Sequence, residues 1–333
     1  MSAFEKIQPI LGKNPEHIQI SNSEIQTFKS CKRKWMLGVY YGLSPDKEEF
    51  VGPLPLGVRI HNALDHYYTE GVKDSHPMDE YVRLQNADNL RFADSPDASN
   101  SEAVSKFQKE SELGRIILEG YLDWVEEEHA DTEIEFIVNE IALRYFPEEF
   151  DGRVEIIGKI DALVRRIFSD TYAILDFKTA QHFKDYLVAS HHSEQLPLYI
   201  NLKNKTAKPG EPKVDGGRYR LLKKVKRTGT AKPPFYQDVD VRFNKKSLDA
   251  HWKRTIGTIQ EILDLRQNLD DNKDHLVYAY PTQKMGWECQ TCPFFKGCFM
   301  LDDGSDAEGF FTDFYVQKDP NARYDEAKES ENE

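Results

Sequence analysis

Residues 157–179 have the sequence IGKIDALVRRIFSDTYAILDFKT, and this stretch decides the fold that we expect. Its two halves are rich in Ile, Val, Leu and Phe and are joined by a polar turn at residues 169–171, a pattern that predicts two neighbouring β-strands. Each strand carries one acidic residue within its apolar run, Asp161 in the first and Asp176 in the second. The sequence therefore predicts a hairpin that holds two carboxylates.

The two carboxylates create a charge conflict that a metal ion would resolve. Asp161 and Asp176 are expected to lie side by side, and a buried carboxylate is costly unless it is paired or bound to a cation. Lys178 faces the same side as Asp176, because strand side chains repeat every two residues. Two carboxylates, Mg²⁺ or Mn²⁺ and a lysine suit phosphodiester hydrolysis, since the metal polarises the phosphate and lowers the pKa of a bound water. Taken alone, the Asp-Phe-Lys triplet favours an ordinary hairpin with these side chains on its surface.

Length and composition bound the class of protein. A chain of 333 residues that is 39% hydrophobic can bury a sizeable core, as one elaborated domain or two small ones. No apolar run approaches the length of a membrane span, and residues 1–17 lack the basic-then-apolar order of a signal peptide, so we expect a soluble intracellular protein without a membrane partner. The net charge of -13 argues against a general nucleic-acid coat, so any DNA contact must be local.

One basic stretch stands out from this acidic background. Residues 203–232 contain eleven Lys or Arg and two acidic residues, which gives +9, so the remainder of the chain carries -22 (-13 minus 9). Such asymmetry is typical of contact with a phosphate backbone, and the DNA-binding candidates within it are Lys223, Lys224, Lys226 and Arg227. The Pro, Gly and Lys content of the stretch equally fits a flexible loop.

The chain has four cysteines, and three of them are close together. Cys289 and Cys292 form a C-x₂-C pair, and Cys298 follows after five intervening residues, so all three can surround one centre. Only Cys31 is left to complete the site, which would tie the start of the chain to its end. Such grouping in an intracellular protein indicates a metal rather than disulfides. Spacing alone leaves zinc and an iron-sulfur cluster equally open.

Periodicity, capping boxes and breakers predict a mixed α/β chain. Helices are expected at residues 23–39, 58–70, 104–128, 183–203 and 244–269. Strands are expected at residues 134–145, 154–163 and 236–243. In this arrangement Cys31 lies in the middle of a helix, and Glu140 lies on a strand, where it faces either the carboxylate site or a cross-strand partner.

We expect one main domain over residues 21–318, with its cysteine-rich segment at residues 286–300. Residues 1–20 are expected to be flexible, and residues 319–333 to form a disordered acidic tail. Residues 71–100 are polar and contain several breakers, so they are expected to form an irregular insertion or a mobile lid.

Two helices carry further site candidates. His61 would face inward from the helix at residues 58–70, with Asp65 and His66 as competing ligands. Gln195 and Tyr199 are four residues apart and so share one face of their helix.

The joint order of these motifs resembles that of RecB-like nucleases of the PD-(D/E)XK superfamily. The motifs are Gly57 with His61, Gly158 with Asp161, the Asp-Phe-Lys-Thr of residues 176–179, and Gln195 with Tyr199. The four flanking cysteines are similar to those of the branch with an iron-sulfur cluster, which includes the CRISPR-associated four-cysteine exonuclease. The resemblance covers roughly residues 21–298, and Asp176 stands where many members have Glu.

The resemblance implies both a fold and a set of roles. The fold is a restriction-endonuclease-like core, a mixed central sheet flanked by helices, with the N- and C-terminal segments joined by a 4Fe-4S cluster of structural role. The implied metal ligands are His61, Asp161, Asp176 and the main-chain carbonyl of Phe177. Lys178 is implied as the catalytic lysine, with Gln195 and Tyr199 positioning it or the substrate.

The expected function is that of a DNA exonuclease acting on single-stranded DNA or DNA ends in recombination, repair or phage DNA processing. It would work in the cytoplasm of a bacterial or phage-infected cell, with a helicase or recombination protein as a possible partner. One alternative is a DNA-binding or assembly subunit that keeps the nuclease fold and works through such a partner. Another is a protein stapled by zinc.

Overall fold

The computed structural model describes residues 3–10, 17–47, 49–69, 76–282 and 286–324. The chain forms two compact units. The terminal unit contains residues 1–48, 142–158 and 249–333, and the central unit contains residues 49–141 and 159–248. Within the described ranges, no helix is both long and apolar enough to cross a membrane.

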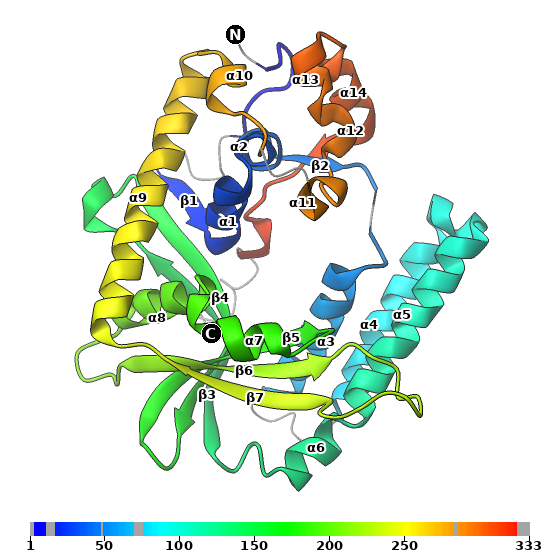
Figure 1. The fold of residues 1–333 in the computed structure, drawn as a ribbon, viewed down its shortest axis with the longest axis vertical. Helices are drawn as coiled ribbons and strands as arrows, with labels where there is room; N and C mark the ends of the chain where they lie inside the picture. Colours follow the sequence, from blue (N-terminus) through cyan, green and yellow to red (C-terminus); the bar gives the residue numbers. More distant parts are fainter. Residues whose placement is uncertain (1–2, 11–16, 48, 70–75, 283–285, 325–333) are drawn as a thin grey trace. The chain divides into compact units, whose positions relative to one another are not determined.

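The central unit combines most of the sheet with six helices among its described residues (Figure 1). The helices are α3 Pro53–Tyr68, α4 Pro77–Ala93, α5 Ser101–Glu119, α6 Tyr121–Glu127, α7 Lys184–Ala189 and α8 Gln195–Thr206. The strands are β3 Ile134–Tyr145, β4 Val154–Arg166, β5 Thr171–Ala180, β6 Val214–Lys223 and β7 Tyr236–Arg242, of which β3 and β4 each extend into the terminal unit.

The sheet is mixed. Among the described residues it has six strands, in the order β1-β4-β5-β6-β7, with β3 also paired to β4. β4 and β5 are antiparallel, β5 and β6 are parallel, and β6 and β7 are antiparallel. The prediction of an α/β fold with a mixed central sheet flanked by helices is therefore confirmed.

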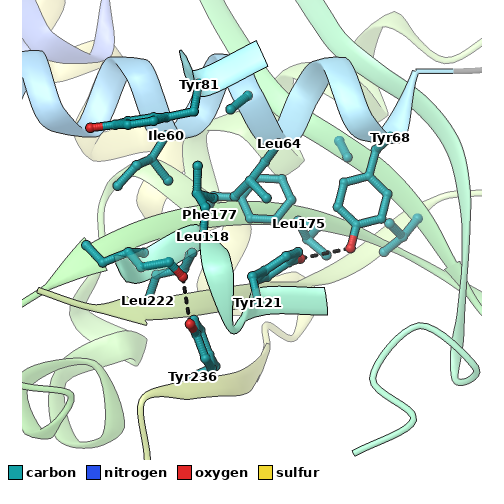
Figure 2. Close-up of a cluster of buried hydrophobic side chains, with 14 of the residues drawn as sticks. Ile60, Leu64, Tyr68, Tyr81, Leu118, Tyr121, Leu175, Phe177, Leu222 and Tyr236 are labelled. Carbon is teal, nitrogen blue, oxygen red and sulfur yellow. Dashed lines mark hydrogen bonds between the residues drawn. The ribbon is translucent and has the colours of Figure 1, made fainter. Parts of the chain in front are cut away.

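The apolar face of α3 packs on the sheet and fixes the position of the helix. Ile60 and Leu64 of α3 belong to the same buried cluster as Leu175 and Phe177 of β5 (Figure 2). The ring of Tyr68, one turn beyond Leu64, stacks on Phe177 with centroids 5.9 Å apart. Ile60 is fully buried in this contact. His61, the next residue of α3, is therefore held beside the sheet.

The terminal unit contains one long helix and several short ones. Its helices are α1 Asn22–Ser30, α2 Lys32–Trp35, a π-helical turn at Met36–Tyr40, most of α9 Lys245–Asp270, α10 His275–Tyr278, α11 Trp287–Gln290, α12 Phe295–Cys298, α13 Met300–Asp303 and α14 Ala307–Phe314. Its short strands are β1 Ile18–Ser21, which runs parallel to the start of β4, and β2 Leu43–Pro45, which is antiparallel to β8 Tyr315–Gln317.

The expected flexible ends are wrong where the structure describes them. Ile18 begins a strand that pairs with Val154 of β4, and Phe4 is only 4% exposed. At the other end, Asn321 donates to the carbonyl of Gln19, 3.1 Å away. These partners lie more than a hundred residues apart in sequence, so local composition could not reveal them. Residues 1–2, 11–16 and 325–333 lie outside the described residues.

The helix expected at residues 23–39 is interrupted at Cys31, which has an extended backbone (φ -160°, ψ 114°). Cys31 is instead the N-cap of α2, and its Sγ accepts a hydrogen bond from the Lys34 amide at 3.4 Å. The prediction that Cys31 lies in mid-helix is therefore wrong. A sulfur at an N-cap position is a weak signal, because the usual N-cap residues are Ser, Thr, Asp and Asn.

Two regions are helical where the sequence predicted no helix. α3 begins at Pro53, before the helix expected at residues 58–70, because the first turn of a helix leaves its amides without partners and so tolerates proline. The expected insertion at residues 71–100 contains α4, whose buried face includes Gln85 and Asp88. Polar residues on the buried face conceal the helical period from a hydrophobicity pattern. Residues 70–75 lie outside the described residues.

Two long predicted helices are each broken once. The helix expected at residues 104–128 is divided at Gly120 into α5 and α6, and the one expected at residues 183–203 is divided before Gln195 into α7 and α8. The strand predictions at residues 134–145 and 236–243, and the helix prediction at residues 244–269, agree with the structure to within a few residues.

The basic stretch at residues 203–232 is not a single loop, because it contains β6. Arg218 and Arg220 lie on this strand, are 6% and 0% exposed, and stand directly opposite Asp240 and Asp238 of β7. Both nitrogens of each guanidinium fork donate to the facing carboxylate at 2.8–2.9 Å. Two of the eleven basic residues are therefore committed to the sheet and cannot contact DNA.

Arg220 lies at the centre of a buried polar network. Its Nη1 donates to Asp131 at 2.6 Å and to the hydroxyls of Tyr68 and Tyr121, each at 3.1 Å. The two hydroxyls are 2.8 Å apart and hydrogen-bonded to each other, and Figure 2 draws this bond as a dashed line. The network therefore links α3, α6, β6 and β7, and its two tyrosines belong to the same buried cluster as Phe177.

We expect Arg220→Leu to lower the free energy of unfolding by about 3–5 kcal/mol, because it leaves Asp131 without its cation and Asp238 with only the longer contact to Arg218 at 3.5 Å. Lys224→Ala removes a half-exposed cation from the same stretch and serves as the control, with an expected change within about 0.5 kcal/mol. Urea denaturation followed by circular dichroism measures both. Equal midpoints for the two variants would contradict this account of the network.

Candidate active site

The first pair of site residues joins α3 to β4. His61 Nδ1 lies 3.3 Å from Asp161 Oδ2, and the two side chains are 29% and 24% exposed, so solvent or substrate can reach them. The same carboxylate oxygen accepts a hydrogen bond from the main-chain amide of Phe177, 2.8 Å away. The β4–β5 ladder ends at Ala162 and Leu175, just before this contact. Asp161 is thus held from both sides at the end of the ladder.

The second pair lies on β5. Lys178 Nζ donates to Asp176 Oδ1 at 2.9 Å and lies 2.8 Å from Oδ2, but Oδ2 accepts no hydrogen bond of good geometry although it is buried. Lys178 also donates to Gln195 Oε1 at 3.3 Å, and Gln195 Nε2 donates to the Tyr199 hydroxyl at 3.4 Å. The structure therefore brings Asp176, Lys178, Gln195 and Tyr199 together in one chain of contacts.

The charges of the two pairs act on one another. Burial alone would raise the pKa of Asp161, but the His61 imidazolium, its hydrogen bond and the Lys178 ammonium lower it below its usual value. Burial raises the pKa of Asp176, and the charge of Asp161 adds to this effect against the opposing Lys178. Burial lowers the pKa of Lys178, but the charges of Asp176 and Asp161 outweigh it and leave it above its usual value. The mutual effects indicate that the four groups form one site.

The donor set suits a hard divalent cation. It offers an imidazole nitrogen and two carboxylates, one with a buried oxygen, Asp176 Oδ2, that accepts no hydrogen bond. Among the described residues, no three His, Cys, Asp or Glu side chains already stand at the mutual spacing of a metal's ligands. In this arrangement the Lys178 ammonium lies against Asp176 and supplies the compensating positive charge. The residues present therefore fit Mg²⁺ or Mn²⁺ by their chemistry.

A third carboxylate stands close to the site. Burial, together with the charges of Glu140 and Asp161, raises the pKa of Asp65 to about 7, and its Oδ1 is buried without a hydrogen-bond partner. Glu140 itself forms an ion pair with Lys159 of β4 at 2.5 Å, so the cross-strand alternative holds for it. His66 is exposed. The i, i+4 spacing of His61 and Asp65 is the signal that points to this carboxylate.

Sequence motifs did not single out two tyrosines beside Lys178. Tyr186 of α7 packs edge-on against Tyr219 of β6, with ring centroids 5.3 Å apart, and the Tyr219 hydroxyl bonds to Ser193 at 2.7 Å. The charge of Lys178 affects the pKa of both tyrosines. Tyr219 stands opposite Asp176 in the β5–β6 register, so only the pairing of strands far apart in sequence could have identified it.

The structure gathers the four cysteines within the terminal unit. Burial raises the pKa of Cys292 and of Cys298, and the charges of neighbouring cysteines, Cys31 among them in both cases, raise it further. Cys31 Sγ accepts amide hydrogen bonds from Lys34 and Thr282, at 3.4 and 3.3 Å. Amide donors of this kind stabilise a thiolate that binds iron or zinc. Across the described ranges, no three of these side chains already have ligand spacing.

The four DNA-binding candidates lie where the chain leaves β6. Lys226 pairs with Glu112 of α5 at 2.6 Å, and Lys223 Nζ donates to the Lys232 carbonyl at 2.9 Å. The Arg227 guanidinium lies 3.9 Å above the ring of Phe235. Lys224 is half-exposed. These cations are nearer the surface than Arg218 and Arg220, but three of them already have partners within the central unit.

Comparison with known proteins gives the family. A model of the PD-(D/E)XK nuclease superfamily matches residues 19–299. A solved structure of a candidate exonuclease from Eubacterium rectale is 11% identical, with a TM-score of 0.45, and the match covers 83% of this chain and 88% of that one. A second, of the protein SSO0001, is 16% identical with a TM-score of 0.28, and the match covers 75% and 86% of the two chains. No curated protein matches the chain. Since the family model spans well over half of its length, the chain belongs to the PD-(D/E)XK nuclease superfamily.

Proposed function

We propose that this nuclease is a metal-dependent DNA exonuclease that acts on single-stranded DNA or DNA ends in recombination, repair or phage DNA processing. The observation that carries the proposal is the electrostatic coupling of two ion pairs, His61 with Asp161 and Asp176 with Lys178. The order of its motifs supports the RecB-like branch of the superfamily, working in the cytoplasm of a bacterial or phage-infected cell, with a helicase or recombination protein as partner.

The proposed metal ligands are His61, Asp161, Asp176 and the main-chain carbonyl of Phe177. When bound, Mg²⁺ or Mn²⁺ would polarise the scissile phosphate and lower the pKa of the attacking water. The Phe177 amide and His61 keep the Asp161 carboxylate in one orientation. These contacts orient the Asp161 carboxylate before the substrate binds. Preorganisation of this kind is a main source of electrostatic stabilisation in active sites.

Lys178 is the proposed catalytic lysine. Because neighbouring carboxylates favour its ammonium form, it donates hydrogen bonds to the attacking water or to a phosphate oxygen and does not accept a proton. Gln195 is the proposed positioning residue, since its Oε1 accepts from Lys178 while its amide nitrogen contacts Tyr199. Lys223, Lys224, Lys226 and Arg227 are proposed to bind the DNA backbone, with Lys226 and Arg227 exchanging their present partners for phosphate.

The four cysteines are proposed to hold a 4Fe-4S cluster with a structural role. Their mutual effects on pKa and the two amide hydrogen bonds to Cys31 support a shared metal centre. The resemblance to the iron-sulfur branch favours the cluster over zinc. The cluster would join Cys31, near the start of the chain, to the segment at residues 286–300.

We expect Asp176→Asn and Lys178→Met each to lower hydrolysis of end-labelled DNA at least about 100-fold, because each removes a charge that acts in the transition state. Single- and double-stranded substrates are compared with Mg²⁺, with Mn²⁺ and with EDTA, which should abolish the reaction. Asp185→Asn, an exposed carboxylate of α7, is the control and should keep wild-type activity.

Titration of Mn²⁺ by electron paramagnetic resonance supplies a readout that does not depend on turnover. Asp176→Asn should weaken Mn²⁺ binding, whereas Asp185→Asn should not. If the wild-type protein binds DNA but hydrolyses neither substrate with either metal, the DNA-binding or assembly subunit is the better description.

We expect anaerobically purified protein to be brown, with broad absorbance at roughly 400 nm from cysteine-ligated iron. Cys289→Ser should reduce this band and the iron content together, because it removes one of four ligands. Ser30→Ala, next to Cys31 in the chain but without a thiol, is the control and should keep both. Colourless wild-type protein with stoichiometric zinc would instead indicate the zinc-stapled alternative.

A further inference from the structure

A cavity of about 360 Å³ lies in the terminal unit, whereas the four groups of the candidate active site belong to the central unit. Its wall comes from the end of α1, the start of α2, one face of α9 and the segment after α10. The side chains that matter to the argument are Phe28, Lys29, Lys32, Glu261 and Tyr280. We refer to it as the Lys32–Tyr280 pocket.

The pocket places a cation between two aromatic rings. Lys32 Nζ lies 5.4 Å from the centroid of the Phe28 ring and 5.5 Å from that of Tyr280. The Phe28 ring is buried at 3% exposure, while Tyr280 is 46% exposed. One ring therefore forms part of the floor, and the other offers a face to a ligand.

The main chain holds this wall in place. The Tyr280 carbonyl accepts from the Arg33 amide at 3.3 Å, and the preceding Ala279 carbonyl accepts from Arg33 Nε, also at 3.3 Å. Two residues later, the Thr282 amide donates to Cys31 Sγ. An exposed tyrosine on an anchored backbone costs little conformational entropy when it packs against a ligand, which is a requirement for a preformed site.

The chemistry of the pocket matches that of one nucleotide. An exposed aromatic face stacks on a base with little regard to its identity, and a neighbouring ammonium binds the adjoining phosphate. Lys29 adds a second ammonium at the rim, whereas Glu261 opposes an anion. A cationic ligand is disfavoured because the Lys32 ammonium, which lies over both rings, would repel it. The volume is within the range of small-ligand sites.

We propose that the Lys32–Tyr280 pocket binds one nucleotide of single-stranded DNA, with its base on Tyr280 and its phosphate on Lys32 and Lys29. The ligand class rests on the proposed nuclease function, but binding itself requires neither hydrolysis nor a metal at the active site. The pocket thus gives an acidic chain a local DNA contact outside the stretch at residues 203–232. It is also a contact that duplex DNA, with its bases stacked, cannot make.

Fluorescence anisotropy of a labelled oligothymidylate, with the full-length protein in EDTA, measures this binding. Tyr280→Ala should weaken it about tenfold, a factor typical of losing one stacked base. Tyr278→Ala removes a tyrosine of similar exposure, 37%, from the same segment but outside the pocket, and should bind as wild type. Wild-type affinity for Tyr280→Ala, or equal losses for both variants, would overturn the proposal.

Charge variants test the phosphate contact. Lys32→Gln should reduce the slope of log affinity against log salt by about 0.7, the value for one phosphate of a single strand. Glu261→Gln should tighten binding, because it removes the opposing carboxylate. An unchanged salt slope for Lys32→Gln, or weaker binding by Glu261→Gln, would contradict a phosphate at this position. Circular dichroism and absorbance near 400 nm verify that each variant keeps its fold and cysteine centre.

Photocrosslinking locates the base directly. An oligonucleotide with one 5-iododeoxyuridine should crosslink to the peptide that contains Tyr280, and the product should disappear in Tyr280→Ala but persist in Tyr278→Ala. Crosslinks found only elsewhere would reject the pocket.

Manganese-dependent hydrolysis of bis(p-nitrophenyl) phosphate, a diester too small to span two sites, should be unchanged by Tyr280→Ala. If the wild-type protein does not hydrolyse this diester, the proposed nuclease function is contradicted. The binding proposal is then decided by the anisotropy measurements alone.

Discussion

The candidate active site depends on how one carboxylate, that of Asp161, is stabilised inside the fold. It accepts from the Phe177 amide and lies against the His61 imidazole, so both of its neighbours must be in place before the charge can be buried at acceptable cost. His61 is in place because Ile60 and Leu64 pack α3 on the sheet, and Phe177 lies in the same apolar cluster. Packing and electrostatics therefore depend on the same few residues. Loss of the α3–β5 contact would remove the imidazole and leave Asp161 with one hydrogen bond.

Several buried charges of the central unit are compensated by an opposite charge close by. Arg218 donates hydrogen bonds to Asp240 and Arg220 to Asp238, and the Lys178 ammonium forms an ion pair with Asp176. The two arrangements differ in one respect. The arginine pairs lie inside the sheet at low exposure and serve its stability, whereas the Lys178 pair includes a carboxylate oxygen that accepts no hydrogen bond. A pair that leaves such an oxygen is suited to accept a further ligand, and this difference separates a structural ion pair from a candidate catalytic one.

The terminal unit shows how a cysteine site and an aromatic pocket can share one local structure. The break at Cys31 turns its sulfur toward amide donors and at the same time starts α2, on which Lys32 reaches the rings of Phe28 and Tyr280. Arg33, the next residue, holds the main chain of the opposite wall and also bonds Asp302 at 2.6–2.9 Å. Three consecutive residues thus contact the proposed cysteine centre, the Lys32–Tyr280 pocket and α13.

The sequence alone indicated the two strands that carry the site, since the Ile, Val, Leu and Phe around Asp161 and Asp176 favour strands. It also specified the set of chemically distinctive residues, because order and spacing of His61, Asp161, Asp176, Lys178, Gln195 and Tyr199 are properties of the chain. The tertiary structure decided which charges are available. Arg218, Arg220 and Lys224 belong to the same basic stretch, and the sequence does not show which of their charges are accessible. Pairing with β7 buries the two arginines. The structure likewise decided that Cys31 caps a helix, because cysteine is a weak N-cap signal, and that residues 77–93 form one, because their buried face is partly polar. Local sequence patterns indicate which interactions a side chain can make, whereas long-range pairing and burial determine whether it is accessible to make them.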